Sequence, residues 1–587
     1  MRAFNFCCGL LLASLGWGHG GLVAAQPVSA SDLALGERIY QRGMLTDQQP
    51  LRAAYAQGAA VIGRDAACVN CHRPSGLGSV EGDVVIPPIT GRALFGQGEP
   101  LTVRADRRFE PGLAAKHTAY DEASLAATLR LGRHINGREL HALMPRYQFT
   151  DEQVQALAAY LRSLSVQWSP GVSDSHIRMA TVLTPDLAPE RRQAFLNTLN
   201  TLVAQININI HSGQRQKVSA IERRVQARRQ WTLDVWELSG PPESWQQQLV
   251  ERQRQAPVFA LLSGLGGVQW QPVHDFCEQQ QVVCWFPSVD IPPPNAASGQ
   301  FNLYFADRVG AEAQVLARRV NGGRVLQWVT DDPLARHGAA QLRQSLGQRG
   351  AGAPSVVDAD LPTDAMAAAR ALATLTPEDH LVLWLRETDL RLLRQVPAPA
   401  AAVLASASLL GSDEPSLPPD WRRNFSLAQS LEVANLRAAN LERFHAWLSG
   451  SRVALVDARM QSEVYFAARA MLFTLRSMLT NFHTPYLIER AETTISMFET
   501  MQVQEEIQAA MMAPVNKRPV TAQPAPDPAL AERQRARLEE MRQRGGTTAY
   551  PRLSLAAGQR VASKGAYLGR LNPGDPGFAE RPELLQP

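Results

Sequence analysis

The sequence predicts a multi-domain protein in which a smaller, helical domain precedes a larger, two-lobed α/β domain. Three observations lead to this prediction. The chain has 587 residues, which is too long for one hydrophobic core at roughly 150 residues per domain. The segment WSPGVSDS, residues 168–175, has the composition of a linker. Beyond it, short apolar runs alternate with amphipathic helical segments, which is typical of parallel sheets covered by helices.

Composition and charge exclude one class of partner. The hydrophobic fraction of 45% and the charged fraction of 19% are those of a globular protein. The net charge is +4, and the basic residues are dispersed along the chain. Nucleic acid is therefore not expected as a partner.

The N-terminus has the features of an export signal, which we place at residues 1–25. Arg2 supplies a positive start, residues 6–15 supply an apolar stretch, and small residues precede a cleavage site after Ala25. An uncleaved anchor is the alternative, but the apolar run is shorter than the ~20 residues that a bilayer span needs. No later segment is apolar enough to cross a membrane. The sequence thus predicts export to the periplasm, with no transmembrane segment after signal cleavage.

The run CVNCH at residues 68–72 is the attachment signature of a c-type haem. The thiols of Cys68 and Cys71 would form the covalent links, and His72 would ligate the iron. A thioredoxin-like redox pair would need a βαβ context, whereas the surroundings are a Gly-rich loop. A zinc site would need further ligands at short spacing, and none is present. One such motif predicts one covalently attached haem c.

The flanking segments resemble a class I cytochrome c, an all-α fold, between Leu33 and Ser165, and we place this domain at residues 31–165. LALGERIY, residues 33–40, resembles the N-terminal helix, with Gly36 where helices cross. VIPPITG, residues 85–91, resembles the segment whose proline carbonyl accepts the hydrogen bond of the axial histidine. Pro88 or Pro87 would fill that role. TDEQVQALAAYLRSLS, residues 150–165, resembles the closing helix, with Thr150 and Gln153 as a capping box.

The Met-Pro pair at Met144 resembles the distal ligand loop of that family, which makes Met144 the expected second axial ligand. His134 and His141 are alternative ligands, and core filling is the alternative role for Met144. A methionine or a histidine as the second axial ligand would leave no open coordination position on the iron. A six-coordinate iron favours electron transfer over catalysis. The expected partner is a periplasmic dehydrogenase or another cytochrome. Longer segments than a small cytochrome needs precede the haem motif and follow Arg92.

The remainder of the chain is expected to form two α/β lobes, because it has more strand–helix units than one sheet usually holds. The expected helices begin at Pro189, Pro242, Val268, Asp364 and Val464. The expected strands share short, apolar, often β-branched sequences: RMATVLTP, WTLDVWEL, PVFALLSGLG, VVCWFPS, RVLQWVTDD, HLVLWLRE, AAVLASAS and RVALVDA.

This order of elements resembles the type I periplasmic solute-binding proteins, of the branched-chain amino-acid receptor kind, from His176 to Arg570. We place the domain at residues 176–570, with a Pro- and charge-rich insert at about 513–546 and an irregular tail at 571–587. The resemblance implies that two lobes enclose a small ligand. The full set of amino-acid contacts of that family is not recognisable, so no branched-chain ligand is assigned.

Ligands of open α/β sheets bind beyond the carboxyl ends of the strands. Residues at such positions, or at the start of a helix near the cleft, are Ser263, Gly266, Ser288, Asp290, Asp331, Glu463 and Tyr465. Gly267 and Asp332 adjoin them. Hydroxyls and amides would hold a carboxylate or phosphate, and acids would hold an amine. Ordinary turn chemistry is the alternative explanation for each residue.

Two further cysteines, Cys277 and Cys284, lie in HDFCEQQQVVCWFP. In an exported chain they are compatible with a disulfide, and equally with two buried free thiols.

Three functions follow from these features. The first is an electron carrier whose α/β domain recognises a small ligand or docks a redox partner. The second is a solute receptor or sensor of an ABC-type uptake system that carries a haem domain. The third, an enzyme such as a peroxidase, needs an open iron position and is disfavoured if Met144 ligates. The sequence therefore favours a carrier or binding protein over a catalyst.

Overall fold

A computed structural model describes residues 29–81, 84–96, 118–214, 229–512, 548–574, 578–580 and 582–586. The predicted signal at 1–25 and the insert at 513–546 lie outside the described residues. The chain divides into two compact units, Met1–Val166 and Gln167–Pro587, each of which we describe by itself.

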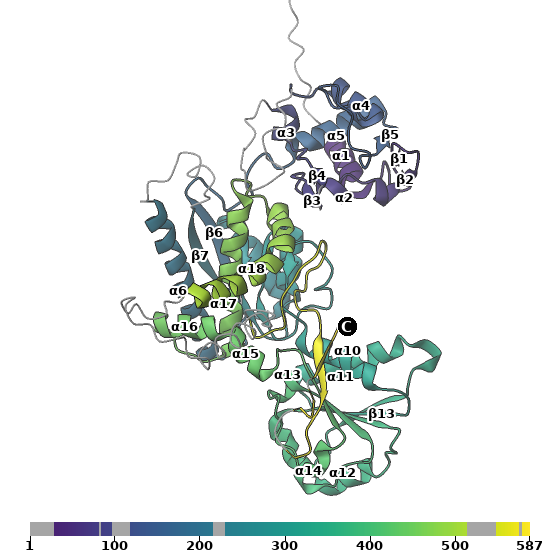
Figure 1. The fold of residues 1–587 in the computed structure, drawn as a ribbon, viewed down its shortest axis with the longest axis vertical. Helices are drawn as coiled ribbons and strands as arrows, with labels where there is room; N and C mark the ends of the chain where they lie inside the picture. The colour runs from purple at the N-terminus through teal and green to yellow at the C-terminus, as the bar shows by residue number, and fades with distance from the viewer. Residues whose placement is uncertain are drawn as a thin grey trace, which may run out of the picture. The chain divides into compact units, whose positions relative to one another are not determined.

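The first unit is built around helices at its two ends (Figure 1). Its helical segments are α1 (Ala30–Arg42), η1 (Gly63–Ala66), α2 (Val69–His72), α3 (Gly91–Phe95), α4 (Glu122–Leu131) and α5 (Asp151–Ser163). The capping box predicted for α5 is confirmed: the Thr150 side chain accepts from the Gln153 amide, and the Gln153 side chain accepts from the Thr150 amide. Helix α1 ends at Gly43 in the left-handed conformation.

Helices α1 and α5 cross at Gly36, as predicted. A Cβ atom at Gly36 would lie 2.2 Å from the carbonyl oxygen of Ala156 and 2.7 Å from the Cβ of Tyr160. Only glycine therefore permits this approach of the two backbones. The neighbouring residues Ile39, Leu157 and Val154 belong to the buried apolar cluster of the unit.

We expect Gly36→Ala to lower the free energy of unfolding of the first unit by about 2 kcal/mol or more, because the new methyl group meets backbone that cannot rotate away. Denaturant titration followed at the haem absorbance measures this change. Gly347→Ala in the second unit, followed by tryptophan fluorescence, is the control, since a Cβ there meets nothing within 4 Å. It should leave stability unchanged or slightly higher. Equal losses for both variants would contradict the crossing argument.

Short antiparallel strands complete the first unit. The order β2-β1-β5 joins β1 (Arg52–Ala54), β2 (Ala60–Ile62) and β5 (Arg146–Tyr147), while β3 (Ser79–Glu81) pairs with β4 (Val84–Ile86). Strands β1 and β2 come from the segment that precedes the haem motif. The Tyr147 hydroxyl also donates to the Ala66 carbonyl at 3.1 Å. The long segment before the motif therefore fastens the chain just beyond Met144 to the chain just before Cys68.

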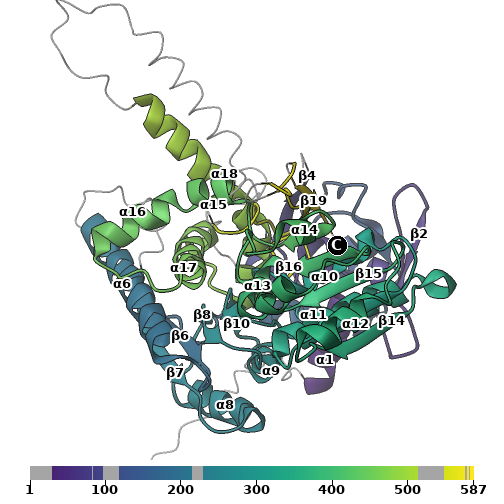
Figure 2. The same ribbon diagram turned by 90° about the horizontal axis from the view of Figure 1, so that it is seen from below.

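The first lobe of the second unit contains a parallel sheet of order β11-β9-β6-β8-β10-β12, with β7 paired to β6. Its strands are β6 (His176–Leu183), β7 (Gln230–Glu237), β8 (Ala260–Leu262), β9 (Leu265–Gly266), β10 (Val283–Trp285), β11 (Ser288–Val289) and β12 (Asn302–Leu303). Its helical segments are α6 (Pro189–Gln214), η3 (Pro242–Ser244), α8 (Trp245–Gln255), α9 (Gln271–Gln280), α17 (Ala458–Met478) and α18 (Thr484–Met512). Helix α17 packs against α6 and α18 (Figure 2).

The second lobe has the sheet order β14-β13-β15-β16-β17-β18-β19. Its strands are β13 (Val325–Val329), β14 (Val356–Asp360), β15 (His380–Trp384), β16 (Ala402–Ser406), β17 (Phe425–Gln429), β18 (Ala566–Arg570) and β19 (Glu583–Leu585). The first five run parallel, and β18 and β19 are antiparallel additions. Its helical segments are α10 (Arg308–Arg319), α11 (Pro333–Gly347), η4 (Gly350–Gly352), α12 (Ala365–Leu372), η5 (Glu387–Gln395), α13 (Ala407–Leu410) and α14 (Pro419–Arg422).

Three crossings join the lobes, the last of them between Val561, which pairs with Tyr304 of the first lobe, and β18 in the second. The chain first passes from β12 in the first lobe to α10 in the second. It returns through α15 (Ala434–Asn440) and α16 (Glu442–Ser451), where the Trp447 indole donates to the Gln205 side chain on α6 at 2.7 Å. The predicted two-lobed α/β architecture is therefore present.

One local prediction was wrong. RVALVDA forms no strand, and Leu455 and Val456 within it are each 54% exposed, because the run is short and leads directly into Asp457, the N-cap of α17. Within the predicted linker at residues 168–175, the Trp168 indole donates to the Thr480 carbonyl at 2.8 Å. The tail at 571–587, which is predicted to be mostly irregular, includes one short strand, β19, among its described residues.

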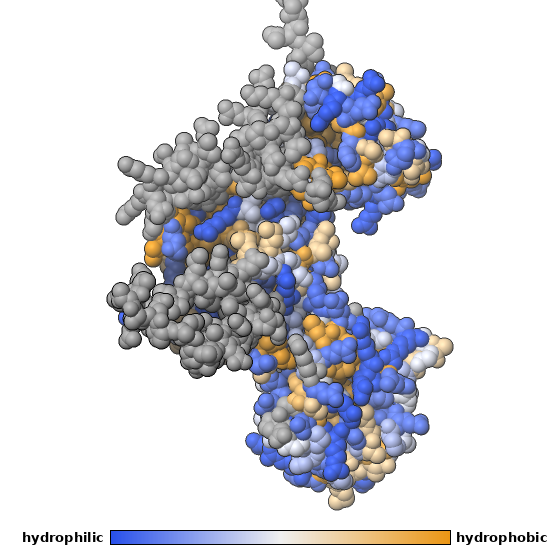
Figure 3. Space-filling view, in the orientation of Figure 1, coloured by the Kyte–Doolittle hydropathy of each residue, from blue (hydrophilic) through white to orange (hydrophobic). Residues whose placement is uncertain are grey.

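On the face drawn in Figure 3, hydrophilic residues alternate with separate apolar patches. Within the described ranges, no helix combines the length and apolar character needed to cross a membrane.

Candidate haem site and candidate ligand site

The two thiols and the imidazole of the haem motif come from one helical turn. Cys68 is the N-cap of α2, and the His72 amide donates to the Cys68 carbonyl at 2.9 Å. Cys68 and His72 are buried, whereas Cys71 is exposed. Burial raises the pKa of the Cys68 thiol to about 12. The turn thus presents two thiols that differ in exposure next to a buried imidazole, which is the donor set that a covalently attached haem requires.

A backbone carbonyl holds the His72 ring in place. Its Nδ1 lies 3.0 Å from the Pro87 oxygen, which can only accept, so Nδ1 carries the hydrogen and Nε2 is left for iron. No other hydrogen bond of this ring occurs among the described residues. Burial lowers the pKa of His72 to about 4, so the ring is neutral, as a metal ligand must be. The residues present therefore fit a haem.

The structure corrects the choice of Pro88 as the residue that accepts this hydrogen bond. Sequence analysis named Pro88 or Pro87, and the carbonyl that receives the bond belongs to Pro87. The two residues follow β4 in extended chain, where successive carbonyls point to opposite sides. Only one of them can face the imidazole.

The distal loop contains the three residues considered as the second axial ligand. Met144 is half-buried and packs against the apolar cluster that includes Cys68. The Nδ1 atoms of His134 and His141 accept backbone hydrogen bonds at 3.3 Å from residues two positions later, so both rings are held in local turns. The His134 ring also packs edge-on against Tyr120 of this cluster, at 5.8 Å between ring centroids. Packing sets Met144 apart from His141, which is exposed, and the ligation by Met144 remains a prediction.

Residues 55–165 match the family model described as cytochrome c. The first unit contains a cytochrome c domain. The matched residues of this cytochrome c domain include the haem motif, the Pro87 segment, the distal loop and the closing helix α5. The family implies a covalently attached haem and haem-based electron transfer.

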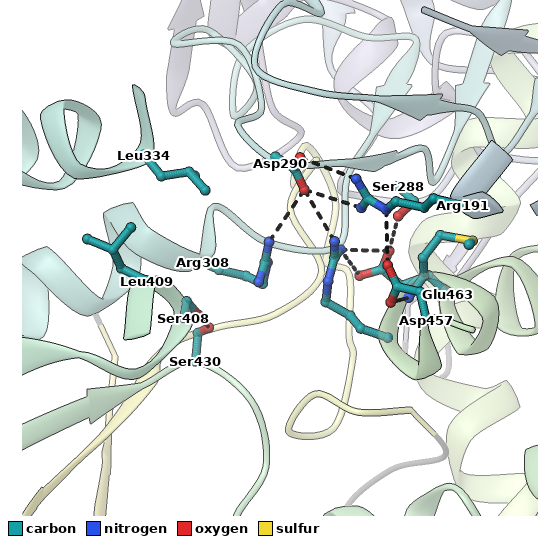
Figure 4. Close-up of polar contacts among 12 residues, drawn as sticks. Arg191, Ser288, Asp290, Arg308, Leu334, Ser408, Leu409, Ser430, Asp457 and Glu463 are labelled. Carbon is teal, nitrogen blue, oxygen red and sulfur yellow. Dashed lines mark hydrogen bonds and ion pairs between the residues drawn. The ribbon is translucent and has the colours of Figure 1, made fainter. Parts of the chain in front are cut away.

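Three of the residues predicted to bind ligand come together in the second unit (Figure 4). Ser288, at the start of β11, donates through Oγ to Glu463 Oε2 at 2.5 Å, and Glu463 is buried on α17. Asp290 follows β11 and shares the Arg459 guanidinium with Glu463. The carboxyl end of one strand and the first turns of a distant helix therefore build one polar cluster.

Sequence analysis missed the arginines of this cluster. Arg191, at the start of α6, contacts Asp290 at 3.3 and 3.4 Å and Asp457 at 3.0 Å. Arg459 contacts Glu463 at 2.9 and 3.1 Å and Asp290 at 3.3 Å. The spacing of Arg459 and Glu463, four residues apart on one helix, was the available signal for that pair.

Tyr550 brings the segment that follows residues 513–547 into the same cluster. Its hydroxyl donates to Glu463 Oε1 at 2.5 Å, and its pKa is raised by burial and by the Glu463 charge. Burial opposes the charge of Arg459, but Glu463, Tyr550 and the two aspartates raise the pKa of that guanidinium above its ordinary value. Arg459 is therefore a fixed cation at the centre of the cluster.

The remaining predicted residues lie outside this cluster. Asp331 is exposed and pairs with Arg336, and Asp332 caps α11. Tyr465 packs against Phe444 and Trp447, two rings of α16.

Two predicted residues lie at the strand ends next to this cluster. Ser263 is buried with φ of 56°, and its Oγ has no hydrogen-bond partner among the described residues. Gly266 leaves room for the Trp270 ring, which a Cβ would approach to 2.5 Å. A strained, unsatisfied serine at this position is a feature that clusters at ligand sites, whereas Gly266 is explained by packing.

Cys277 on α9 and Cys284 on β10 are both buried free thiols. Burial raises the pKa of Cys277. The disulfide between them remains a prediction.

The solved structures similar to this chain include several substrate-binding proteins. A possible leucine/isoleucine/valine-binding protein from Rhodopirellula baltica SH 1 has 9% identity and a TM-score of 0.40, and the match covers 70% of this chain and 98% of that one. An ABC transporter substrate-binding protein from Desulfitobacterium hafniense has 12% identity, a TM-score of 0.40, and coverage of 70% and 100%. A branched-chain amino-acid ABC transporter protein from Thermus thermophilus with bound valine has 11% identity, a TM-score of 0.38, and coverage of 70% and 97%.

The second unit has the two-sheet α/β body predicted from the sequence, and its own sheets and crossings define that architecture. Identities and TM-scores this low carry no information about the ligand of this chain. No curated protein sequence matches the chain.

Proposed function

We propose that this protein is a periplasmic electron carrier with one covalently attached haem. In this proposal His72 and Met144 hold the iron, and the α/β domain recognises a small ligand or docks a redox partner. The observation that carries the proposal is the CVNCH turn, whose buried His72 donates through Nδ1 to the Pro87 carbonyl and leaves Nε2 for iron.

The haem, when bound, supplies one-electron chemistry. The residues of this chain attach, orient and shield it. Cys68 and Cys71 would form the two thioether bonds, and the Pro87 carbonyl fixes the plane of the His72 ring and raises its basicity. If Met144 closes the sixth position, no site stays open for a substrate, which favours electron transfer over catalysis.

Periplasmic location is supported by the predicted signal at residues 1–25 and by the two domain types found together. The alternative function is a solute receptor or sensor of an ABC-type uptake system. The polar cluster at Asp290 and Glu463 supports this alternative function, because an electron carrier by itself needs no ligand site.

The test of the carrier proposal is the haem content and redox behaviour of the protein expressed with export. We expect one covalent haem per chain by intact mass and by the pyridine haemochrome spectrum. We also expect a reversible one-electron titration. A protein exported with no covalent haem, or with a haem that rapidly consumes peroxide, would overturn the proposal.

Met144→Ala should change the optical spectrum of the oxidised protein and lower its reduction potential, because a thioether stabilises the reduced iron. Axial ligands set haem potentials over about 0.8 V, and we expect a shift on the order of 100 mV. The variant should also bind added imidazole. His134→Ala and His141→Ala are the matched controls and should behave like the unaltered protein. If one of them shifts the potential and Met144→Ala does not, that histidine is the ligand.

A further inference from the structure

We propose that the ligand site of the second unit binds a small organic monocarboxylate that lacks an ammonium group, and that Arg308 binds its carboxylate. This inference rests on the ligand-recognising role proposed above. It names the chemical class of the ligand from the side chains of this chain.

Arg308 is a buried cation with too few partners. It is the first residue of α10, directly after the first crossing between the lobes, and it is only 9% exposed. Within the described part of the chain, its one polar contact is with Asp290 Oδ1 at 3.9 Å. A guanidinium has five N–H donors, and leaving them unsatisfied in a buried place is costly. An anion bound beside Arg308 would satisfy them.

Asp290 does not satisfy this need, because three guanidiniums share it. Its contacts with Arg191 and Arg459 are 3.3–3.4 Å long, and the contact with Arg308 is longer still. Charge-assisted hydrogen bonds are usually about 2.7–2.9 Å long. Burial and the nearby Arg459 both lower the pKa of Arg308, which is the signature of a cation lacking a close counter-charge. The arrangement therefore has room for a second carboxylate.

An ammonium group, by contrast, finds no free acid in the cluster. Glu463 accepts from Ser288, Tyr550 and Arg459. Asp457 accepts from Arg191 and from the Met460 amide at the start of α17. Each acid of the cluster is thus held by an arginine, and an ammonium would meet fixed cations.

The acids beside Arg308 on the second lobe are also engaged. Asp307, the N-cap residue of α10, accepts from the Gly310 amide and contacts His337 Nε2 at 2.9 Å. Glu312, one turn after Arg308 on α10, is fully buried. It accepts from the Ser406 hydroxyl, from the Ser408 hydroxyl and amide, and from the Ser430 amide. Its donors are all neutral, and they leave no oxygen for a ligand amine. The site therefore selects against the amine half of an amino acid.

The second-lobe side chains around Arg308 are uncharged. In Figure 4, Leu334 and Leu409 lie to the left of Arg308, and Ser408 and Ser430 lie below it. The two leucines belong to the buried apolar cluster that contains Val309. Uncharged surroundings suit a hydrocarbon skeleton better than a second charged group, so the expected ligand carries one carboxylate.

A series of ligands with one carbon skeleton tests this inference on the full haem-loaded protein by calorimetric titration. The probes are 4-methylpentanoate (carboxylate only), leucine (both groups) and 3-methylbutylamine (amine only), with butanoate and benzoate as further carboxylates. We expect at least one of the amine-free carboxylates to bind, leucine to bind at least tenfold more weakly than 4-methylpentanoate, and the amine not to bind. Tighter binding of leucine or of the amine would overturn the inference.

Arg308→Gln should weaken carboxylate binding at least 30-fold, and Arg308→Lys should weaken it less, because it keeps the charge but loses the two-pronged contact. Arg336→Gln is the control, since Arg336 is exposed on α11 and pairs with Asp331. Unchanged affinity in Arg308→Gln, with native circular dichroism, would refute the role of Arg308.

The outcomes separate this inference from the proposed function. Preference for an amine leaves ligand recognition standing and removes the carboxylate class. Binding of none of the probes removes the carboxylate class and the support for ligand recognition. In that case the spectrum and potential of the haem still decide the electron-carrier proposal.

Discussion

Replacing Cys68 and Cys71 together by alanine is expected to give an exported protein with no covalently bound haem. Both thiols come from the single turn that also places His72. Without thioether bonds, the iron is held by side-chain ligands alone, and haem is lost on denaturation and extraction. Intact mass and haem staining after denaturing electrophoresis measure the result.

The chain contains its own matched control for this experiment. Cys277 and Cys284 form the second cysteine pair, and they are buried within the first lobe of the other unit. Replacing both by alanine should leave the haem content at one per chain, even if the fold of that lobe is weakened. Covalent haem in the Cys68→Ala/Cys71→Ala protein, or its loss from the control, would contradict the assignment of the motif.

The cytochrome c domain was predictable because short stretches of sequence determine its main features. The five residues of the motif fix the thiols and the proximal ligand, and Gly36 and Thr150 mark helix ends and crossings by their own chemistry. The choice between Pro87 and Pro88 was not available from sequence, since adjacent residues differ only in the direction of their carbonyls.

The α/β domain was predictable as an architecture and less so in detail. Strongly apolar runs such as HLVLW became strands, whereas FSLAQ, which carries Ser and Gln, was missed although all five residues are buried in β17. Helix α18 was also missed. RVALVDA has the composition of a strand but no neighbouring strand to pair with, so pairing overrode propensity.

The polar cluster shows why sequence analysis identifies only some of the residues of a site. Ser288, Asp290 and Glu463 were found because strand ends and helix starts can be located from local patterns. Their partners come from far away in the chain: Arg191 and Asp290 are 99 residues apart, and Glu463 and Tyr550 are 87 apart. No local pattern links such positions, and without them the acids looked available for an amine.

Glu463→Gln is expected to lower the free energy of unfolding of the second unit by about 3–5 kcal/mol, the usual cost of breaking a buried ion pair from one side. The Glu463 carboxylate is 1% exposed and receives only donors: Ser288 and Tyr550 at 2.5 Å and Arg459 at 2.9 and 3.1 Å. A glutamine places an NH2 group against one of those donors and leaves Arg459 without its main counter-charge.

Denaturant unfolding followed by tryptophan fluorescence measures this loss, while the haem absorbance follows the first unit, which should be unaffected. Glu251→Gln is the matched control, because Glu251 pairs with Arg254 on the exposed face of α8 and should be dispensable.

Tyr550→Phe removes one donor and keeps the charge of Glu463, so its loss of stability should be smaller. The Glu463→Gln/Tyr550→Phe double variant should lose less than the sum of the two, since both changes remove the same hydrogen bond. Two outcomes would show that the cluster does not hold the segment after residue 547 against α17. One is strict additivity of the two losses, and the other is a Glu463→Gln protein as stable as the Glu251→Gln protein.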